Sequence, residues 1–174
     1  MNFNLGFYAT THNKSSKVDI LKVYDEIKDE HMKINRFMIA APKSGSGKTM
    51  ITCALLQLLK DSGKNVLSYK CGPDYIDPMF HKTVIGTAAY NLDTYLMSND
   101  AVNYLLNKNS GDIAVIEGVM GFYDGFSFTE KGSTHELSEI TDTDVILVVN
   151  CRGMSLSAMA LVKGFKEFRK NNIK

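Results

Sequence analysis

The chain has 174 residues, of which 44% are hydrophobic and 22% are charged, and its formal net charge is +1. This length and composition are typical of one soluble globular domain with its own core. The near-neutral charge argues against bulk electrostatic binding to nucleic acid or to a membrane. No apolar run is as long as a membrane span, and the start of the chain shows no charged-then-apolar signal, so we expect a cytoplasmic protein.

Residues 1–31 differ in composition from the rest of the chain. A polar opening is followed by one short amphipathic helical pattern over residues 18–27, in which Val18, Leu21 and Ile27 share a face. Residues 32–35 lead straight into the first strand pattern, so Met32 is a plausible start of the functional chain. We expect residues 1–31 to be a dispensable extension, weakly ordered or partly helical, and residues 32–174 to form the domain.

From residue 36 onward, strand and helix patterns alternate. Apolar runs predict strands over residues 36–41, 66–70, 113–117 and 145–150. Helical spacing predicts helices over residues 50–60, 100–108, 134–141 and 155–170, with Ser98 as one N-cap and a capping box at 133–136 as another. Residues 77–90 show only a short helical stretch that Gly86 ends, and residues 118–132 form a glycine-containing loop. The order predicts an α/β domain with a doubly wound, mainly parallel sheet, whose chemistry lies at the carboxyl ends of the strands.

A phosphate-binding loop is predicted between the first strand and the first helix. Residues 41–49 read A-P-K-S-G-S-G-K-T, which fits the K-x-G-x-G-K-T variant of the P-loop, with Pro42 in place of the usual first glycine. In such a loop backbone N–H groups surround the anion, the lysine reaches the outer phosphates and the threonine ligates Mg²⁺. The predicted nucleotide-binding residues are Lys43, Ser44, Gly45, Ser46, Gly47, Lys48 and Thr49. The alternative, a glycine-rich surface turn, is disfavoured by the flanking strand and helix.

Acidic residues follow the second and third predicted strands. Asp74 and Asp77 lie in C-G-P-D-Y-I-D-P, a turn stiffened by two prolines, where they either serve the site or form an Asx-type turn. Glu117 ends the third strand and is well placed to share a Mg²⁺ with Thr49. Without a neighbouring P-loop, Glu117 would more simply be a cap or a surface carboxylate.

Five motifs in register resemble one family. K-S-G-S-G-K-T, C-G-P-D-Y-I-D-P, N-L-D-T-Y-L-M, E-G-V-M-G-F-Y-D-G and S-T-H-E-L-S-E-I together resemble the amino-terminal, ATP-using domain of cobyrinic acid a,c-diamide synthase, from about Met32 to the last residue. The wider group, which includes dethiobiotin synthetase, is similar in the P-loop and in the acidic strand end.

The resemblance implies ATP- and Mg²⁺-dependent amidation of the a and c carboxylates of a corrin-type ring, through an acyl phosphate and with glutamine-derived ammonia, in cobalamin biosynthesis. It implies that Gly45 to Thr49 hold phosphates and that Thr49 and Glu117 hold Mg²⁺. Asp74 and Asp77 would position metal or substrate. The implied catalytic residues are Lys48, Asp74, Asp77 and Glu117, with Asp124 as a further candidate. Tyr75 or Tyr123 would line the ring pocket, unless their packing is ordinary.

The chain departs from this family in length. The resemblance implies a following glutaminase domain and further sheet, so we expect the domain to be incomplete at its carboxyl end and prone to associate, for example as a homodimer. Cys53, Cys71 and Cys151 lie far apart and form no C-x-x-C pair. We therefore expect small apolar residues in a reducing compartment, rather than a zinc site, a disulfide or a glutaminase nucleophile.

Two other interpretations stay open at this point. A partition-type regulatory ATPase also carries K-x-G-x-G-K-T, so Lys43 does not discriminate, whereas residues 72–78 and 117–125 favour the amidating family. The chain is otherwise an inactive fragment of the synthase. The substrate is cobyrinic acid, its metal-free form or a nickel-bearing sirohydrochlorin, and the sequence does not choose among them.

Overall fold

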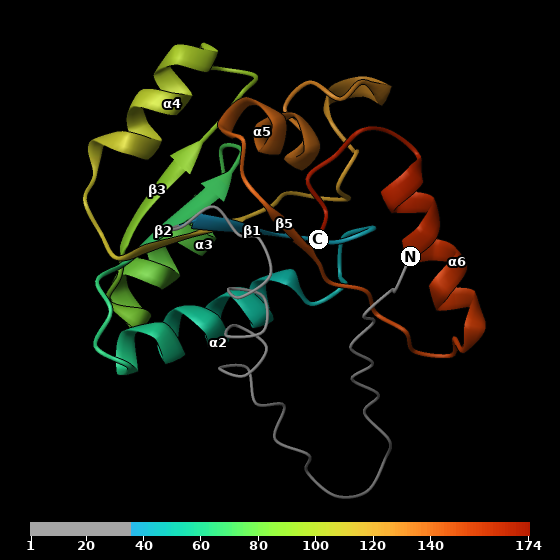
Figure 1. Cartoon of the computed structure of the whole chain (residues 1–174). Coiled ribbons are helices and arrows are strands. Elements are labelled where there is room, and N and C mark those ends of the chain that lie inside the picture. Colours follow the sequence, from blue (N-terminus) through green and yellow to red (C-terminus); the bar gives the residue numbers. More distant parts are fainter. Residues whose placement is uncertain (1–35) are drawn as a thin grey trace, which may run out of the picture. The chain divides into compact units, whose positions relative to one another are not determined.

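The structure, a computed structural model, describes residues 36–174 (Figure 1). The expectations for residues 1–31, including the helical pattern over 18–27 and a start at Met32, lie outside the described residues.

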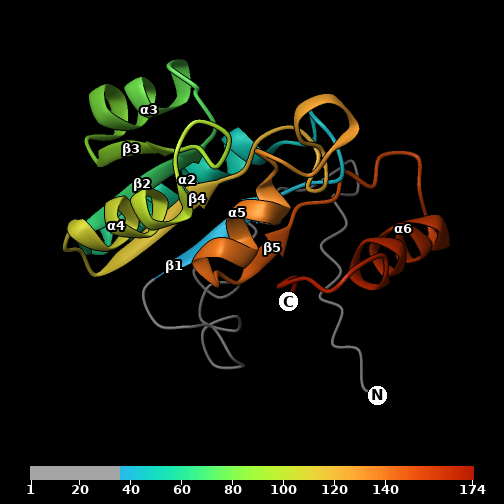
Figure 2. The ribbon, with the colours of Figure 1, turned by 90° about the horizontal axis from the view of Figure 1, so that it is seen from above.

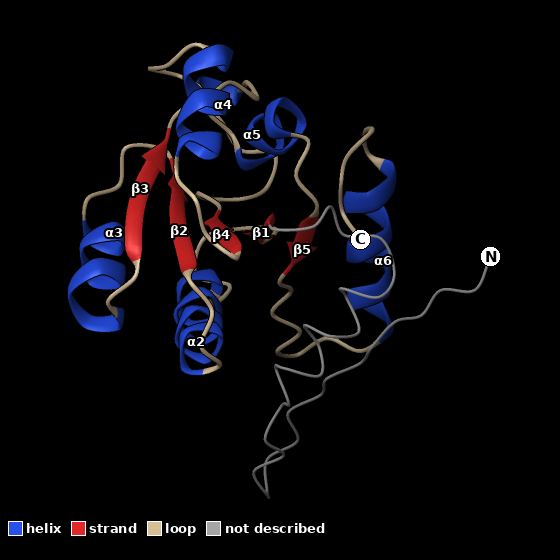
Figure 3. Cartoon of the chain, turned by 60° about the vertical axis from the view of Figure 1, so that its left-hand side comes forward, coloured by secondary structure: helices blue, strands red, loops and turns tan. Residues whose placement is uncertain are grey.

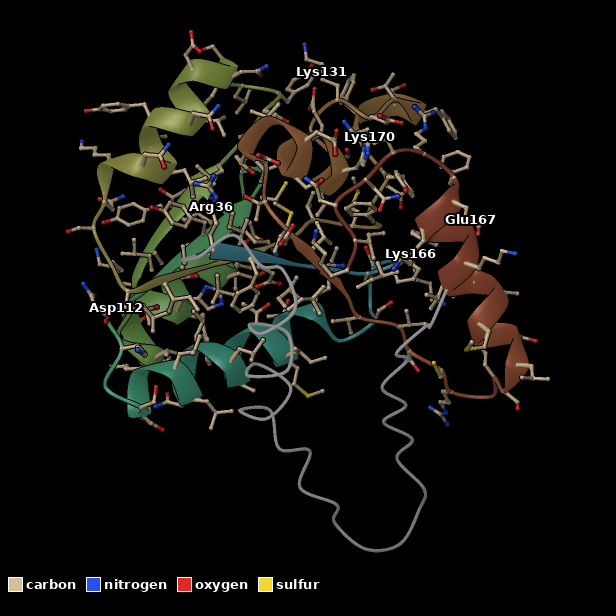
Figure 4. The ribbon with its side chains drawn as sticks, viewed as in Figure 1. Arg36, Asp112, Lys131, Lys166, Glu167 and Lys170 are labelled. Atoms are coloured by element: carbon tan, nitrogen blue, oxygen red, sulfur yellow. The ribbon has the colours of Figure 1, made fainter. Side chains whose placement is uncertain are left out.

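A sheet of five parallel strands forms the centre of the domain, in the order β3-β2-β4-β1-β5. The strands are β1 (Arg36–Ala40), β2 (Val66–Cys71), β3 (Ala88–Leu92), β4 (Ile113–Glu117) and β5 (Val145–Leu147). In Figure 4, Arg36 and Asp112 mark the ends at which β1 and β4 begin. The parallel α/β sheet confirms the predicted fold class.

Helices cover both faces of this sheet. They are α2 (Lys48–Asp61), α3 (Ile76–Phe80) with the π-helical turn η1 (His81–Ile85), α4 (Asn99–Lys108), the 3₁₀ turn η2 (Phe126–Phe128), α5 (Thr134–Thr141) and α6 (Leu156–Glu167). Along the chain, the steps from β1 to β2 and from β2 to β3 run toward one edge of the sheet. The steps from β3 to β4 and from β4 to β5 run toward the other edge. Because crossovers between parallel strands are right-handed, α2 and α3 lie on one face, and α4 and α5 lie on the other (Figures 1 and 3). α6 lies beyond β5, at the end of the sheet away from β3 (Figure 2).

The two faces of the sheet differ in composition, because side chains alternate between them along each strand. Met38, Tyr69 and Ile116 are fully buried in the main core cluster with Val102 of α4 and Leu137 of α5. Successive residues of a strand point to opposite faces, so the neighbours of these residues face α2 and η1 instead. That second face carries polar groups as well as apolar ones, and the candidate site begins there.

Two strands differ from the sequence predictions. β3 was not predicted, because only Leu92 of its five residues is buried and the others are exposed or half-buried, as at a sheet edge. β5 was predicted to run to residue 150, but it ends at Leu147, and only Val145 of its three residues is buried. The two edge strands, β3 and β5, are therefore much less buried than β1, β2 and β4.

The helix ends mostly follow the predicted caps. The Ser98 side chain accepts from the Ala101 N–H (3.3 Å), and the Ser133 side chain accepts from the Glu136 N–H (3.0 Å). The capping box is only half formed, because the Glu136 carboxylate accepts from the Gly132 N–H instead of reaching the N–H of Ser133. None of the helices within residues 36–174 is long and apolar enough to cross a membrane.

Candidate functional site

The predicted phosphate-binding loop connects the carboxyl end of β1 to α2. Gly45 (φ 73°) and Gly47 (φ 96°) both adopt the left-handed region, which explains why this loop needs glycine. Gly47 is the N-cap of α2, so the positive end of the helix opens at the loop. Lys43 and Ser44 are exposed, and the Lys43 carbonyl accepts from the Ser46 hydroxyl (2.9 Å).

The last two residues of the motif reach the loop that follows β4. Lys48 is buried, and its Nζ donates to the Met120 carbonyl at 2.5 Å. Burial, with help from Lys70, lowers the pKa of Lys48, while Glu117 and Asp124 oppose the shift. The Thr49 hydroxyl donates to Glu117 Oε1 at 2.5 Å. The structure therefore brings together the two residues that the sequence analysis assigned to Mg²⁺.

Lys70 joins Glu117 to the acidic turn after β2. It pairs with Glu117 in the β2–β4 register, so the two side chains stand next to each other on the same face. Its Nζ lies 3.0 Å from Glu117 Oε1, 2.6 Å from Asp77 Oδ2 and 3.7 Å from Asp74 Oδ2. One buried ammonium thus neutralises part of the charge of three carboxylates.

Sequence reasoning gave Lys70 no role, although a signal was present. A lysine at the end of a mostly apolar strand, directly before C-G-P-D, is unusual because a buried ammonium needs charged partners. The partner could not be named from the sequence, since it requires knowing that β2 pairs with β4.

Burial affects the pKa values of both Glu117 and Lys70. Glu117 is fully buried, and this raises the pKa of its carboxyl, against the opposing effects of Lys70 and the Thr49 hydroxyl. Burial alone would lower the pKa of Lys70, but Glu117 and Asp77 outweigh it and raise that pKa. Lys70 is therefore held as a cation.

Asp74 forms the Asx-type turn considered from the sequence, and its second oxygen faces Lys70. Its Oδ1 accepts from the N–H groups of Ile76 (2.9 Å) and Asp77 (3.3 Å), which is the Asx-type turn that opens α3. Its Oδ2 faces Lys70. Asn91 braces the turn, because its Nδ2 donates to the carbonyls of Gly72 (2.9 Å) and Asp74 (2.7 Å).

The remaining candidates separate into exposed and packed residues. Asp124 is exposed and accepts from the Gly121 N–H (3.1 Å). Tyr75 is 88% exposed beside the two aspartates. Tyr123 donates to the Phe165 carbonyl (2.7 Å), and its ring contacts those of Phe122, His135, Phe165 and Phe168. Its ring is used in internal packing, as the alternative interpretation of Tyr123 held.

The three cysteines are free thiols in different surroundings. Cys71 is buried, and this raises its pKa to about 12, so it is an inert core residue. Cys53 is half-buried, and Cys151 is exposed. The expectation of small apolar packing therefore fits Cys71 but not Cys151.

The donor set fits one Mg²⁺ between the phosphate loop and β4. Thr49 Oγ1 and Glu117 Oε1 are in contact and are hard oxygen atoms of the kind that Mg²⁺ binds, and Glu117 Oε2 is buried without a hydrogen bond among the described residues. Mg²⁺ usually takes only one or two protein ligands and completes its shell with phosphates and water. Within residues 36–174, no group of three or more His, Cys, Asp or Glu side chains is placed to hold a metal by itself. A Mg²⁺ here would therefore depend on nucleotide phosphates.

Comparison with known proteins agrees with this geometry. Residues 37–174 match the family described as the CobQ/CobB/MinD/ParA nucleotide binding domain. A cobyrinate a,c-diamide synthase of Thermoplasma volcanium is 48% identical over 139 residues, which are 79% of this chain and 31% of that protein. The corresponding enzyme of Priestia megaterium is 45% identical over 140 residues (79% and 30%). A hydrogenobyrinate a,c-diamide synthase of Brucella anthropi is 44% identical over 138 residues (78% and 31%).

The match thus spans about a third of the length of these relatives. The family match over residues 37–174 includes the phosphate loop, the acidic turn after β2 and the end of β4. The three relatives named above are cobyrinate and hydrogenobyrinate a,c-diamide synthases, and the chain belongs to the CobQ/CobB/MinD/ParA nucleotide-binding domain family.

Proposed function

We propose that residues 32–174 form the ATP-using domain of a tetrapyrrole a,c-diamide synthase, which activates a carboxylate of a cobyrinate-like ring for amidation. The observation that carries this proposal is the continuous polar connection from Thr49 through Glu117 and Lys70 to Asp77 and Asp74. It joins the phosphate loop to an acidic turn at the carboxyl edge of the sheet, where parallel α/β folds bind their ligands.

The reaction that suits this arrangement is phosphoryl transfer to a carboxylate. The substrate oxygen attacks the γ-phosphorus of ATP, the bond to ADP breaks, and an acyl phosphate forms. Ammonia then attacks the acyl carbon, so that phosphate leaves, a proton is released and an amide remains. Lys48 and the amino end of α2 would stabilise the charge on the phosphoryl oxygens, with Lys43 as a second cation. A bound Mg²⁺ would neutralise phosphate charge further.

Lys70 and the two aspartates would position the substrate. An incoming carboxylate would be repelled by the carboxylates of Asp74, Asp77 and Glu117. Its approach therefore depends on the Lys70 ammonium that lies among them. Holding the attacking oxygen near the phosphate supplies much of the rate, since orientation is the main contribution in such transfers.

An apolar surface next to the aspartates fits a large ring. Tyr75, Ile76 and Met79 are 88%, 72% and 59% exposed, and they lie in α3 or directly before it. Exposed apolar groups gathered beside polar anchors are typical of a ligand surface. We propose that they contact the face of the tetrapyrrole.

Trapping the acyl phosphate tests this function. The chain is incubated with ATP, Mg²⁺ and cobyrinic acid or hydrogenobyrinic acid in the presence of hydroxylamine, which converts an acyl phosphate into a hydroxamate. We expect a hydroxamate of the ring and one ADP for each hydroxamate. ADP formation that does not respond to the acid would favour the regulatory ATPase, and failure to bind ATP would contradict the proposal altogether.

Glu117→Gln tests the assignment of Glu117 to Mg²⁺. The variant keeps the volume but loses the charge, so the Mg²⁺ concentration that half-saturates ATP binding should rise roughly 10- to 100-fold, as expected for the loss of one charge-assisted contact. The measurement is a Mg²⁺ titration of nucleotide binding by calorimetry. Glu167→Gln, on the exposed end of α6 (Figure 4), is the control and should titrate like the parent chain. Equal midpoints for Glu117→Gln and the parent would exclude Glu117 as a ligand.

A further inference from the structure

His81 is a buried histidine that the site described above does not use. It is the first residue of η1 and is fully buried. Its Nδ1 lies 2.8 Å from the Ser68 hydroxyl, and its Nε2 lies 3.7 Å from Glu117 Oε2. Among the described residues, neither His81 Nε2 nor Glu117 Oε2 has a hydrogen bond. Two buried polar atoms that face each other in this way require an explanation.

We propose that His81 is a positioning residue for Glu117: its Nε2–H holds Glu117 Oε2 and thereby keeps Oε1 toward Thr49. This inference rests on the proposed function, in which Thr49 and Glu117 form the Mg²⁺ side of a nucleotide site. His81 itself does not touch the nucleotide.

The tautomer follows from the partners of the ring. Ser68 can donate its hydroxyl proton to Nδ1, which leaves the single proton of a neutral imidazole on Nε2. That proton then points at a carboxylate oxygen. The other tautomer would place the Nε2 lone pair against the Glu117 oxygen, and two acceptors would repel each other in a dry interior.

The surroundings of His81 support a positioning role. Its carbonyl accepts from the Thr87 N–H (3.1 Å) and from the Thr87 hydroxyl (3.2 Å), so two hydrogen bonds fix the backbone of His81. The terminal torsion of a glutamate is broad, and on its own a carboxylate can exchange its two oxygens. With Oε1 contacted by Thr49 and Lys70, a donor at Oε2 fixes the plane of the group. Closing the gap from 3.7 Å to a hydrogen bond of about 2.9 Å needs only a small movement of the ring.

Two variants of the same position separate positioning from simple filling of space. His81→Gln places an amide N–H near the Nε2 position, whereas His81→Asn places one near Nδ1 and leaves Oε2 without a donor. We expect His81→Asn to raise the Mg²⁺ midpoint for ATP binding by roughly 10-fold, as loss of such outer contacts typically does, and His81→Gln to stay within about threefold. ATP binding without Mg²⁺ should be the same in both. Equal effects of the two variants on the midpoint would contradict the proposal, because a purely structural role does not distinguish them.

A spectroscopic readout decides the tautomer without any nucleotide. In the ¹⁵N spectrum of the imidazole groups, the His81 signals are assigned by their absence from His81→Gln. We expect a protonated Nε2 and an unprotonated Nδ1 in the parent chain, and a mixture of tautomers in Ser68→Ala. A proton on Nδ1 in the parent chain would overturn the inference. If the parent chain binds no ATP, the proposed function fails, while the spectrum still reports on the Ser68–His81–Glu117 contact.

Discussion

Replacing Lys48 with alanine should reduce ATP affinity by at least roughly 100-fold, because the change removes charge-assisted bonds to the outer phosphates that contribute about 1.5–3 kcal/mol each. The Nζ of Lys48 is buried beside the loop and donates to Met120, so its position is fixed before any ligand arrives. A fixed cation loses little conformational entropy on binding, which makes its removal costly. The measurement is isothermal calorimetry with ATP and Mg²⁺.

Lys166→Ala provides the matched control for this variant. Lys166 is an exposed lysine in the last turn of α6 (Figure 4), so its loss removes the same charge from a different surface. We expect parent-like affinity for Lys166→Ala and a parent-like circular dichroism spectrum for both variants. Near-normal ATP affinity in a folded Lys48→Ala variant would rule out the P-loop interpretation.

Much of the fold could be predicted from local patterns. The phosphate loop was found because its glycines are required by backbone geometry, as φ values of 73° and 96° at Gly45 and Gly47 show. β1, β2 and β4 were found because their residues are nearly all buried and mostly apolar. Local sequence reports both kinds of constraint directly.

What could not be predicted depends on pairing between distant segments. β3 has an edge pattern that mixes exposed and half-buried residues, so no apolar run marks it. Lys70 and His81 come close to Glu117 only because the order of the sheet places β4 beside β2. In the sequence, Lys70 lies 47 positions and His81 36 positions before Glu117. Local patterns therefore indicated the acidic residues at the strand ends but not Lys70, the cation that lies among them.

Replacing Lys70 with methionine should lower the free energy of unfolding by about 3 kcal/mol or more at pH 7, since removing one partner of a buried ion pair leaves an uncompensated charge. Glu117 is fully buried, and Lys70 is the largest effect holding down the pKa of its carboxyl. Without Lys70 this pKa rises further. The folded variant then takes up a proton more readily than the unfolded chain does, so its deficit relative to the parent should shrink as the pH falls. At high pH the parent chain itself loses stability, because the contribution from the raised pKa of Lys70 is lost as the pH rises above about 10.4. Urea denaturation across this pH range measures both trends.

A surface pair and a double mutant make the Lys70 result specific. Lys163 lies 3.9 Å from Glu167 with a side chain that is 69% exposed, so Lys163→Met should change stability by less than about 0.5 kcal/mol. In a Glu117→Gln background the cost of Lys70→Met should be smaller than in the parent, because the glutamine carries no charge to be left unpaired. The same cost in both backgrounds would show that Lys70 stabilises the domain through Asp74 and Asp77, or by filling space, and that Glu117 is not its main partner. A cost below about 1 kcal/mol in the parent would mean that water reaches the cluster when Lys70 is removed, since only a solvated carboxylate tolerates the loss of its cation so easily.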